Sequence, residues 1–449
     1  MSDARMPAGL IEWLQQSKAR DVELAFPDVH GFARGKTLPA PAFIQGQQLR
    51  IARAVPLQSC VGEFPDYSFY GEHDPDVTLT PDFGTLRPVP WARTPRAMVI
   101  CDCVDHDGSL SPLAPRSVLK ALLARYAARG WTPIVAPELE FYLFAAHGDP
   151  AQPFLPPQLP SGRRETGFDA FGFSALGELE AFFDELYQAC ELLGIETDTC
   201  VHEMGPSQFE INLKHGDALR LADATFMFKT ALKEIAQRHG LSAVCMAKPL
   251  PGQPGSSMHI HQSLVDRQGR NVFSRADGSE SPEFFQFIAG LQRCLPQLMP
   301  LFCPNPNSYR RFVKGMAAPV NLSWGLDNRS VGLRVPVSSP EARRVENRLP
   351  GCDANPYLAL AASLGAGLAG IERELTPDEA VHGNVFKQQA ASLPSTLDAA
   401  CAAMAEGDAA ESLFGAEFSR AYLAVKEVEL NDYHRQVTAW ERQYLGFLV

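Results

Sequence analysis

The chain has 449 residues, which is enough to bury a sizeable core and favours two domains. Its composition, 45% hydrophobic and 20% charged, is that of an ordinary globular protein. A formal net charge of -12 argues against nucleic-acid binding and favours cationic or metal-bound partners.

Nothing in the sequence predicts a secreted or membrane-bound protein. The ten cysteines include no CxxC pair, so we expect reduced thiols in the cytoplasm rather than a disulfide scaffold. Polar and acidic residues interrupt the N-terminal stretch "MSDARMPAGLIEWL", which therefore is not expected to be a signal peptide. The longest apolar run, "LALAASLGAGLAG" from Leu358, is too short to cross a bilayer. We expect no membrane partner.

The first part of the chain has the pattern of a small β-rich unit. Residues 21–39 alternate in polarity around a turn, as a hairpin does, and the apolar run "RAMVICDCV" predicts a buried strand. Between them, residues 63–76 hold five carboxylates together with proline and glycine, which predicts an exposed loop. An amphipathic helix that ends at Gly130 follows. We therefore predict domains at residues 1–111 and 112–449.

Helices and strands alternate in the second part, which predicts an α+β domain. Residues 177–194 and 222–240 carry apolar side chains at helical spacing, and both stretches end at a glycine. A further helix is expected after Asn355, with Asn355 as its cap and Pro356 in its first turn. The Pro-rich stretch at residues 148–165 predicts a surface loop.

Three strands of this domain are predicted to carry functional groups on one face and apolar residues on the other. These groups are Glu138 and Glu140 in "PELEFYLF", Glu210 and Asn212 in "SQFEINL", and His259, His261 and Ser263 in "GSSMHIHQSL". Glu203 precedes the second strand by a Gly-Pro turn. Two carboxylates side by side on an apolar strand raise each other's pKa unless a cation lies between them.

Further strands supply charged side chains, which are Arg344, Glu346 and Arg348 in "RRVENRL" and Arg329 and Arg334 in "NRSVGLRVP". Taken singly, the arginines are consistent with salt-bridge partners and the paired glutamates with a partly exposed strand edge. The two histidines alone are consistent with a half-hydrated strand surface. Together, however, five glutamates and a histidine beside apolar strands are costly to bury without cations.

The combination points to metal and phosphate chemistry. Oxygen-rich sites with an occasional imidazole suit Mg²⁺ or Mn²⁺ better than Zn²⁺. Arginines beside such a cluster suit phosphate and carboxylate binding. Carboxylate-held metals and arginines together are the apparatus of phosphoryl transfer from a nucleotide. Because no GxxxxGK[ST] loop is present, the nucleotide site is of another type. The residues alone predict a metal-dependent enzyme that uses ATP.

Five stretches, in order, resemble the glutamine synthetase family, class I. They are "PELEFYLF", "HEMGPSQFEI", "GSSMHIHQSL", "NSYRRFVKGMAAPVNLSWGLDNRSVGLRVP" and "ARRVENRLPGCDANPYLALAASLGAGL". The resemblance implies an α+β fold with a small N-terminal β-grasp domain and a large catalytic domain, in which helices accompany a curved antiparallel sheet. It also implies a cytoplasmic homo-oligomer, commonly a dodecamer of two hexameric rings, with each active site between two subunits.

Carried over by position, the resemblance implies two or more Mg²⁺ or Mn²⁺ ions per active site. One ion is expected on Glu140, Glu203 and Glu210, and a second on Glu138, His259 and Glu346. ATP, as a substrate, is expected near His261, Ser263, Arg334 and Arg344. Glutamate is expected at Gly255, Arg311 and Arg348, and catalytic roles fall to Arg329, at the transferred phosphate, and to Glu346. The implied reaction forms γ-glutamyl phosphate, which an amine then attacks.

Several positions depart from the family pattern. The flap after the Ser-Tyr-Arg segment is "GMAAP", with Ala317 where the family has a glutamate that shapes the ammonium pocket. A methyl group neither attracts nor deprotonates ammonium, and it leaves room for a larger nucleophile. The family's ammonium-binding Asp-Gly-Ser-Ser motif is not recognisable in residues 63–76, where Asp66 is the candidate to contact an amine. Ala391 replaces the adenylylated tyrosine, and Glu341 replaces a nucleotide-contacting lysine.

Intact metal and glutamate positions beside an altered ammonium pocket resemble the γ-glutamylpolyamine synthetase branch. We therefore expect an ATP-dependent ligase that joins the γ-carboxylate of glutamate to an amine, either a polyamine such as putrescine or a monoamine. Two alternatives are a glutamine synthetase that uses ammonium and a non-catalytic scaffold of the same fold. The acidic loop at residues 63–76 either contacts a cationic amine in the neighbouring subunit or is simply solvated.

Overall fold

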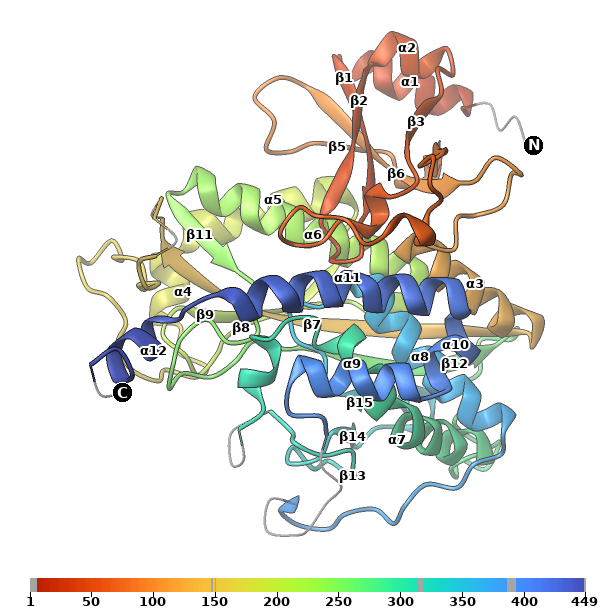
Figure 1. Ribbon diagram of the computed structural model, residues 1–449, viewed down its shortest axis with the longest axis vertical. Helices are drawn as coiled ribbons and strands as arrows, with labels where there is room; N and C mark the ends of the chain where they lie inside the picture. The colour runs from red at the N-terminus through yellow and green to blue at the C-terminus, as the bar shows by residue number, and fades with distance from the viewer. Residues whose placement is uncertain (1–5, 147, 150, 314–317, 386–392, 448–449) are drawn as a thin grey trace.

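The computed structural model describes residues 6–146, 148–149, 151–313, 318–385 and 393–447 of a mixed α and β protein (Figure 1). Its helices are α1 (Ala8–Gln16), α2 (Ala40–Ile44), α3 (Pro115–Ala128), α4 (Ser174–Glu178), α5 (Glu180–Leu193), α6 (Ala218–Arg238), α7 (Pro282–Phe302), α8 (Pro356–Glu372), α9 (Leu397–Glu406), α10 (Ala409–Phe414), α11 (Ala416–Arg435) and α12 (Ala439–Tyr444). Its strands are β1 (Asp21–Pro27), β2 (Ala33–Pro39), β3 (Leu49–Ala52), β4 (Asp76–Pro81), β5 (Arg87–Pro88), β6 (Arg96–Val104), β7 (Trp131–Ala145), β8 (Thr197–His202), β9 (Gln208–Leu213), β10 (Gly216–Asp217), β11 (Leu241–Val244), β12 (Met258–Asp266), β13 (Trp324–Leu326), β14 (Leu333–Val335) and β15 (Val345–Asn347). None of the helices described combines the length and the apolar character that crossing a membrane requires.

A 6-stranded sheet forms the N-terminal part, in the order β2-β1-β6-β4-β3 with β5 beside β6. Strands β1 and β2 are the two arms of the predicted hairpin and pair antiparallel. Asp28 closes their turn, because its Oδ1 accepts hydrogen bonds from the backbone N–H groups of His30 and Phe32, each at 2.9 Å. The predicted strand β6 runs parallel to β1. Helices α1 and α2 lie beside this sheet, at the end of the molecule farthest from α7 (Figure 1).

A 9-stranded sheet forms the larger part, in the order β13-β14-β15-β12-β7-β9-β8, and β10 and β11 also pair with β7. Strand β7 spans 15 residues and is flanked by β12 and β9, both antiparallel to it. Its side chains Leu139, Phe141 and Leu143 are buried in the main hydrophobic core. This packing leaves the intervening side chains, on the other face of the strand, for polar contacts.

The helices predicted from apolar spacing are present as α3, α5, α6 and α8. Asn355 caps α8 as predicted, since its Oδ1 accepts hydrogen bonds from the N–H groups of Tyr357 and Leu358 at 2.9 and 3.3 Å. The Pro-rich stretch at residues 148–165 contains neither helix nor strand in the positions described. The loop prediction for that stretch is therefore confirmed.

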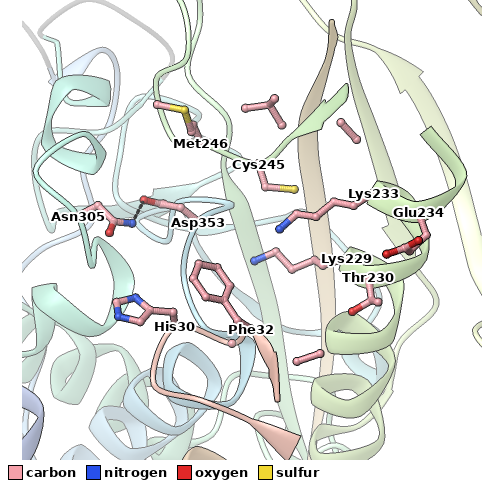
Figure 2. Close-up of a pocket in the computed structure, with 14 residues that line it drawn as sticks. His30, Phe32, Lys229, Thr230, Lys233, Glu234, Cys245, Met246, Asn305 and Asp353 are labelled. Carbon is pink, nitrogen blue, oxygen red and sulfur yellow. Dashed lines mark hydrogen bonds between the residues drawn. The ribbon is translucent and has the colours of Figure 1, made fainter. Parts of the chain in front are cut away.

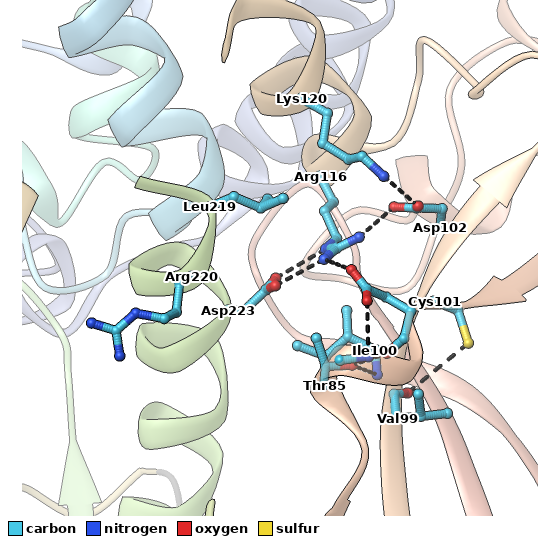
Figure 3. Close-up of polar contacts among 12 residues, drawn as sticks. Thr85, Val99, Ile100, Cys101, Asp102, Arg116, Lys120, Leu219, Arg220 and Asp223 are labelled. Atoms are coloured by element: carbon cyan, nitrogen blue, oxygen red, sulfur yellow. Dashed lines mark hydrogen bonds and ion pairs between the residues drawn. The ribbon is translucent and has the colours of Figure 1, made fainter. Parts of the chain in front are cut away.

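A buried ion-pair network joins the small sheet to the helices of the larger part (Figure 3). Arg116 of α3 is 2% exposed, and it donates to Asp102 of β6 at 2.6 Å and to Asp223 of α6 at 3.0 and 2.8 Å. Arg116 also donates to Asp82 at 2.7 Å, and the Tyr357 hydroxyl of α8 donates to Asp223 at 2.7 Å. Although burial opposes its charge, the hydrogen bonds and charge of Asp223 raise the pKa of Arg116. The network fixes the small sheet against α6 and α8.

Candidate active site

Strand register brings the predicted functional groups to one face of the large sheet. On one side of β7, Glu138 is paired with His259 of β12, and on the other side Glu140 is paired with Glu210 of β9. Paired residues on neighbouring strands point to the same face, with Cβ atoms about 5 Å apart. The alternation of faces predicted for these strands is therefore present, and it gathers carboxylates and imidazole in one place.

Glu138, His259 and Glu346 form a first group, whose donor atoms all lie within 4.8 Å of one another. His259 Nδ1 lies 3.2 Å from Glu138 Oε2 and 3.9 Å from Glu346 Oε1. Glu346 comes from β15, the next strand beyond β12, and is 1% exposed. Arg334 donates to its Oε2 at 2.8 Å, and Arg348 donates to its Oε1. Three adjacent strands thus supply this group.

Glu140, Glu210 and His259 form a second group within the same limit of 4.8 Å, so His259 belongs to both groups. Glu140 is 8% exposed, and its Oε2 accepts a hydrogen bond from the backbone N–H of Ser257 at 2.8 Å. The third residue predicted here, Glu203, has its Oε2 3.3 Å from the backbone nitrogen of the next residue. The charge of Glu203 nevertheless acts on both Glu140 and Glu210. Glu203 is therefore close enough to repel this pair of carboxylates, but among the residues described it belongs to neither donor group.

The pKa values of these acids are displaced in both directions. Burial and the charge of Glu203 raise the pKa of Glu140 to about 7. Burial and the charges of Glu140 and Glu138 raise the pKa of Glu210 to about 9. Burial also opposes the charge of Glu138, but hydrogen bonds from the two imidazoles of β12 lower its pKa. The second group thus carries an excess of negative charge that protons or cations must offset.

Arginines surround the two groups. Arg311 and Arg348 are 2% and 5% exposed, and in the part of the chain that is described each has a buried Nε without a hydrogen-bond partner. Arg311 also donates through Nη1 to Ser257 Oγ at 2.7 Å. Burial raises the pKa of Glu203, and the charge of the exposed Arg329 partly offsets this rise. Buried cationic donors without partners favour an anionic ligand.

The residues predicted to contact ATP are joined to the first group. His261 Nε2 lies 2.9 Å from Glu138 Oε1, and Arg344 Nε donates to His261 Nδ1 at 3.1 Å. Arg334 is joined through its hydrogen bond to the carboxylate of the first group on β15. Ser263 lies two positions beyond His261 on β12 and so shares its face. An anion bound beside these side chains would meet the guanidinium groups of Arg334 and Arg344. Arg334 is held by Glu346, and Arg344 is held through His261.

Gly255 precedes β12 at a position with no room for a side chain. A Cβ there would lie 2.5 Å from Arg311 Cγ and 2.6 Å from the carbonyl oxygen of Ala247. The Gly255 carbonyl accepts a hydrogen bond from Gln208 Nε2 at 2.9 Å. Glycine at this position therefore lets the backbone approach the Arg311 side chain closely.

The donor set fits hard divalent cations. Its ligand atoms are carboxylate oxygens with one shared imidazole nitrogen, which suits Mg²⁺ or Mn²⁺ and lacks the thiolates of many zinc sites. A cation between Glu140 and Glu210 would offset the repulsion that raises their pKa values. The residues present therefore fit divalent metal ions.

A buried set of contacts behind Glu203 was not predicted from the sequence. His202 is 0% exposed, with Nδ1 2.7 Å from the carbonyl oxygen of Glu203 and Nε2 3.1 Å from Glu165 Oε1. Ser207 donates to Glu165 Oε2 through its backbone N–H at 2.8 Å and its hydroxyl at 2.9 Å. Glu165 ends the Pro-rich stretch, and no local pattern links it to His202. The only sequence signal was the position of His202 beside Glu203.

Two other residues noted in the sequence lie on the surface. Asp66 is exposed on the acidic loop of residues 63–76 and accepts a hydrogen bond from the backbone N–H of Ser68 at 2.9 Å. Glu341 is exposed in a short 3₁₀ helix. The predictions for Ala317 and Ala391 fall outside the residues described.

Comparisons with known proteins agree with this geometry. The model of the glutamine synthetase catalytic domain matches residues 112–445. Gamma-glutamylputrescine synthetase PuuA of Escherichia coli (strain K12) is 34% identical over 432 residues, covering 94% of this chain and 91% of that protein. Glutamate–isopropylamine ligase of a Pseudomonas species is 32% identical over 454 residues, covering 97% of each. A solved structure described as apo GmaS without ligand matches with a TM-score of 0.84 and 29% identity, covering 97% of this chain and 98% of that one.

Proposed function

The chain belongs to the glutamine synthetase family, and from that premise we propose that it is an ATP-dependent ligase joining the γ-carboxylate of glutamate to an amine. The two relatives named above act, by their names, on putrescine and isopropylamine as acceptors. The acceptor proposed here is accordingly an organic amine, either a polyamine or a monoamine. The reaction passes through γ-glutamyl phosphate, and ADP and phosphate are released.

The observation that carries this proposal is the pair of donor groups that share His259 and are surrounded by arginines. We assign one metal to Glu138, His259 and Glu346 and the other to Glu140, Glu203 and Glu210. Mg²⁺ or Mn²⁺ bound there would neutralise the oxygens of the transferred phosphate. The shift of the Glu210 pKa to about 9 supports the second assignment, because it marks a site that favours added positive charge.

The substrates are assigned to the cations and to the glycine turn. We assign glutamate to Gly255, Arg311 and Arg348, since the two buried Nε groups offer donors to its carboxylates. We assign the ATP phosphates to His261, Ser263, Arg334 and Arg344. Arg329 is assigned to the phosphate in transfer, where its guanidinium would stabilise developing charge. Glu346 holds two of the arginines in place besides its role as a ligand.

The acceptor amine is assigned to the flap and to a neighbouring subunit. Ala317 replaces a carboxylate that would favour ammonium, and it leaves space for a larger nucleophile. Asp66 is exposed and hydrogen-bonds within its own loop, which is consistent with a role at a neighbour's site. We propose a cytoplasmic homo-dodecamer of two hexameric rings, with a small domain at residues 1–111 and a catalytic domain at residues 112–449.

An acceptor panel tests the proposal. Purified protein would be supplied with ATP, glutamate, and Mg²⁺ or Mn²⁺, together with putrescine, ethanolamine, isopropylamine or ammonium. Phosphate release would be followed by coupled assay and the γ-glutamyl product by mass spectrometry. We expect at least one organic amine to exceed ammonium in kcat/KM.

The panel also separates this function from a glutamine synthetase activity. Turnover with ammonium and none with any amine would replace the amine ligase by a true glutamine synthetase. Absence of glutamate-dependent ATP hydrolysis with every acceptor would contradict both enzymes. Glu191→Gln, at an exposed position on α5, serves as the matched control for substitutions of the clustered glutamates.

A further inference from the structure

A cavity separate from the metal-binding face lies between the two parts of the molecule. Its volume is about 530 Å³, which is within the range of small-molecule sites. The turn between β1 and β2 forms one wall, and α6 and the end of β11 form two others (Figure 2). None of the 14 lining residues is among those assigned above to metal, ATP, glutamate or amine.

Two lysines of α6 extend their ammonium groups into this cavity. Lys229 and Lys233 are four positions apart, so their side chains lie one helical turn apart on the same face. Figure 2 shows both amines directed toward the space between Phe32 and Cys245. Lys229 Nζ donates to the carbonyl oxygen of Ala354 at 2.9 Å, and Lys233 Nζ lies 5.6 Å from the centroid of the Phe32 ring.

The two lysines lack anionic partners. Across the residues described, no carboxylate oxygen lies within the 4.0 Å ion-pair limit of either ammonium group. Two like charges four positions apart on one helix repel each other and destabilise the helix. An anion bound between the two ammonium groups would attract both of them and offset this repulsion.

The acidic residues of the lining do not neutralise the pair. Asp353 Oδ2 accepts hydrogen bonds from Asn305 Nδ2 at 2.8 Å and from Ser308 Oγ at 2.6 Å. The carboxylate of Glu234 lies on the far side of the lysine stems from their ammonium groups (Figure 2). The cavity is therefore cationic where the two amines meet.

The other residues that line the cavity indicate that a ligand would also have an apolar part. Phe32 is 42% exposed and Met246 is 37% exposed, so both offer apolar surface to the cavity. Cys245 also lines it, and a hydrogen bond from Cys352, together with the charges of the two lysines, lowers the Cys245 pKa to about 6. An aromatic ring and a thioether beside two ammonium groups suit a molecule with an anionic head and an apolar body.

We propose that this cavity binds a small organic anion, in which a carboxylate or phosphate head contacts Lys229 and Lys233 and an apolar body packs on Phe32. Because the turn of the small domain and α6 both line the site, a bound ligand bridges the two parts of the chain. The proposal concerns binding alone and does not depend on the ligase reaction.

Protection of Cys245 from alkylation tests the proposal at the cavity itself. Full-length protein would be treated with iodoacetamide, and labelling of the Cys245 peptide would be timed by mass spectrometry, with Cys60 as the internal reference. Benzoate and phenyl phosphate supply the two anionic heads, and benzamide is the neutral probe of the same size. Only the unliganded cavity reacts, so an anion at ten times its Kd would slow labelling about tenfold.

Two variants and one control locate the effect. Lys233→Met keeps the hydrogen bond of Lys229, and the double variant Lys229→Met/Lys233→Met removes both cations. Lys214→Met removes one lysine outside the cavity, where Lys214 forms an ion pair with exposed Glu196 at 2.9 Å. Protection is taken as a ratio within each variant, because the lysines also affect the reactivity of the thiol.

The expected result is protection by benzoate or phenyl phosphate in the unmodified chain and in Lys214→Met, and loss of most protection in both cavity variants. The anion that protects at lower concentration identifies the head group as carboxylate or phosphate. Equal protection by benzamide, protection that survives in the double variant, or no protection by either anion would overturn the proposal. A Cys245 thiol that never reacts in the assembled protein would overturn it too, because the cavity would then be covered.

Discussion

Arg116 and Asp223 form a bidentate ion pair at the joint between the small sheet and the helices of the larger part, with Nε–Oδ1 and Nη2–Oδ2 distances of 3.0 and 2.8 Å (Figure 3). The same guanidinium reaches Asp102 of β6, so one side chain links α3, α6 and the small sheet. Both partners of the pair are buried, at 2% and 5% exposure. The Arg116 side chain is therefore one of the contacts that hold the small sheet against the helices.

Replacing Arg116 by leucine is expected to destabilise the protein by about 3–5 kcal/mol, because it leaves Asp223 buried without its cation. Asp102 keeps a second cation, since Lys120 Nζ donates to its Oδ2 at 2.6 Å. Denaturant unfolding followed by fluorescence would measure the loss. Arg125→Leu is the control on the same helix, since Arg125 forms a half-exposed pair with Glu372. Equal stability of the two variants would show that the network does not hold the domains.

Glu210→Gln is expected to stabilise the metal-free protein while abolishing metal-dependent turnover. The folded-state pKa of Glu210, about 9, lies above its ordinary value of 4.5. Its contribution to stability is therefore present below pH 4.5 and is lost as the pH rises toward 9. In EDTA, the variant should gain Tm over the unmodified chain at pH 8, and added Mn²⁺ should raise its Tm less. A variant that keeps the full Mn²⁺ response would remove Glu210 from the metal site.

Glu138→Ala or His259→Ala should likewise abolish metal-dependent turnover and leave assembly largely intact. Each substitution removes a donor from the first group, and His259 is shared with the second. Activity assays and size-exclusion chromatography, run beside the Glu191→Gln control, would check both parts. Full activity in either variant would contradict the metal assignment.

Glu165→Ala is expected to weaken metal binding although Glu165 lies outside both donor groups. The carboxylate of Glu165 orients His202, which contacts the carbonyl of Glu203, and loss of such supporting contacts typically costs about 10–100-fold in metal affinity or activity. The Mn²⁺ concentration that gives half-maximal activity would be compared with that of Glu180→Gln, at an exposed position in the first turn of α5. Glu165→Gln should recover part of the loss. An unchanged Mn²⁺ dependence in Glu165→Ala would assign the contact to folding alone.

Glu429 of α11 should make the joint with the small domain sensitive to acid. Its carboxylate contacts Lys426 Nζ at 2.8 Å, His30 Nε2 at 2.6 Å and the backbone N–H of Cys60 at 2.8 Å. Burial opposes its charge, but Lys426 and His30 lower its pKa below 4.5. The contribution of Glu429 is therefore complete above pH 4.5 and is lost as the pH falls through the lower, folded-state value.

The measurement is the Tm difference between the unmodified chain and Glu429→Gln, which should be large at pH 7 and shrink below pH 4.5. Glu427→Gln, at an exposed position on the same helix, should show no such pH dependence. A difference that stays constant from pH 7 to pH 3 would contradict the ionic role of Glu429.

Ala317→Glu should restore preference for ammonium at the expense of bulky amines. The added carboxylate attracts a small cation and occupies the space that a larger nucleophile needs. The ratio of kcat/KM values for isopropylamine and ammonium would fall, while Ala318→Ser, the neighbouring substitution, should change it little. An unchanged ratio would mean that the flap does not select the acceptor.

The strand faces of the site could be predicted because their signal is local. The alternation in "MHIHQS" places His259 and His261 together, and it does so whichever strands lie beside them. Pairing is not a local property. Glu138 and His259 are 121 positions apart, and only the family resemblance predicted that they lie together. The prediction of a capped helix after Asn355 succeeded for the same local reason.

Contacts between residues far apart in the sequence had no such local signal. Arg116 and Asp223 are separated by 107 positions, and each has the pattern of an ordinary charged residue on an amphipathic helix. Glu165 ends a Pro-rich loop whose sequence predicts only exposure. The cavity beside Lys229 and Lys233 depends on how the turn after β1 meets α6, which no periodicity encodes.

Strand β7 imposes a restriction on how this chain can change in evolution. Its register with β12 sets Glu138 opposite His259, while its register with β9 sets Glu140 opposite Glu210. One residue inserted or deleted between Pro133 and Glu138 would turn the site-facing side chains toward the core on one part of the strand. A substitution of Glu138 or of Glu140 changes one donor group. A change in the length of β7, in contrast, shifts side chains of both donor groups at once. Variation in length is therefore expected in the loops, with β7 conserved in length wherever the two groups are retained.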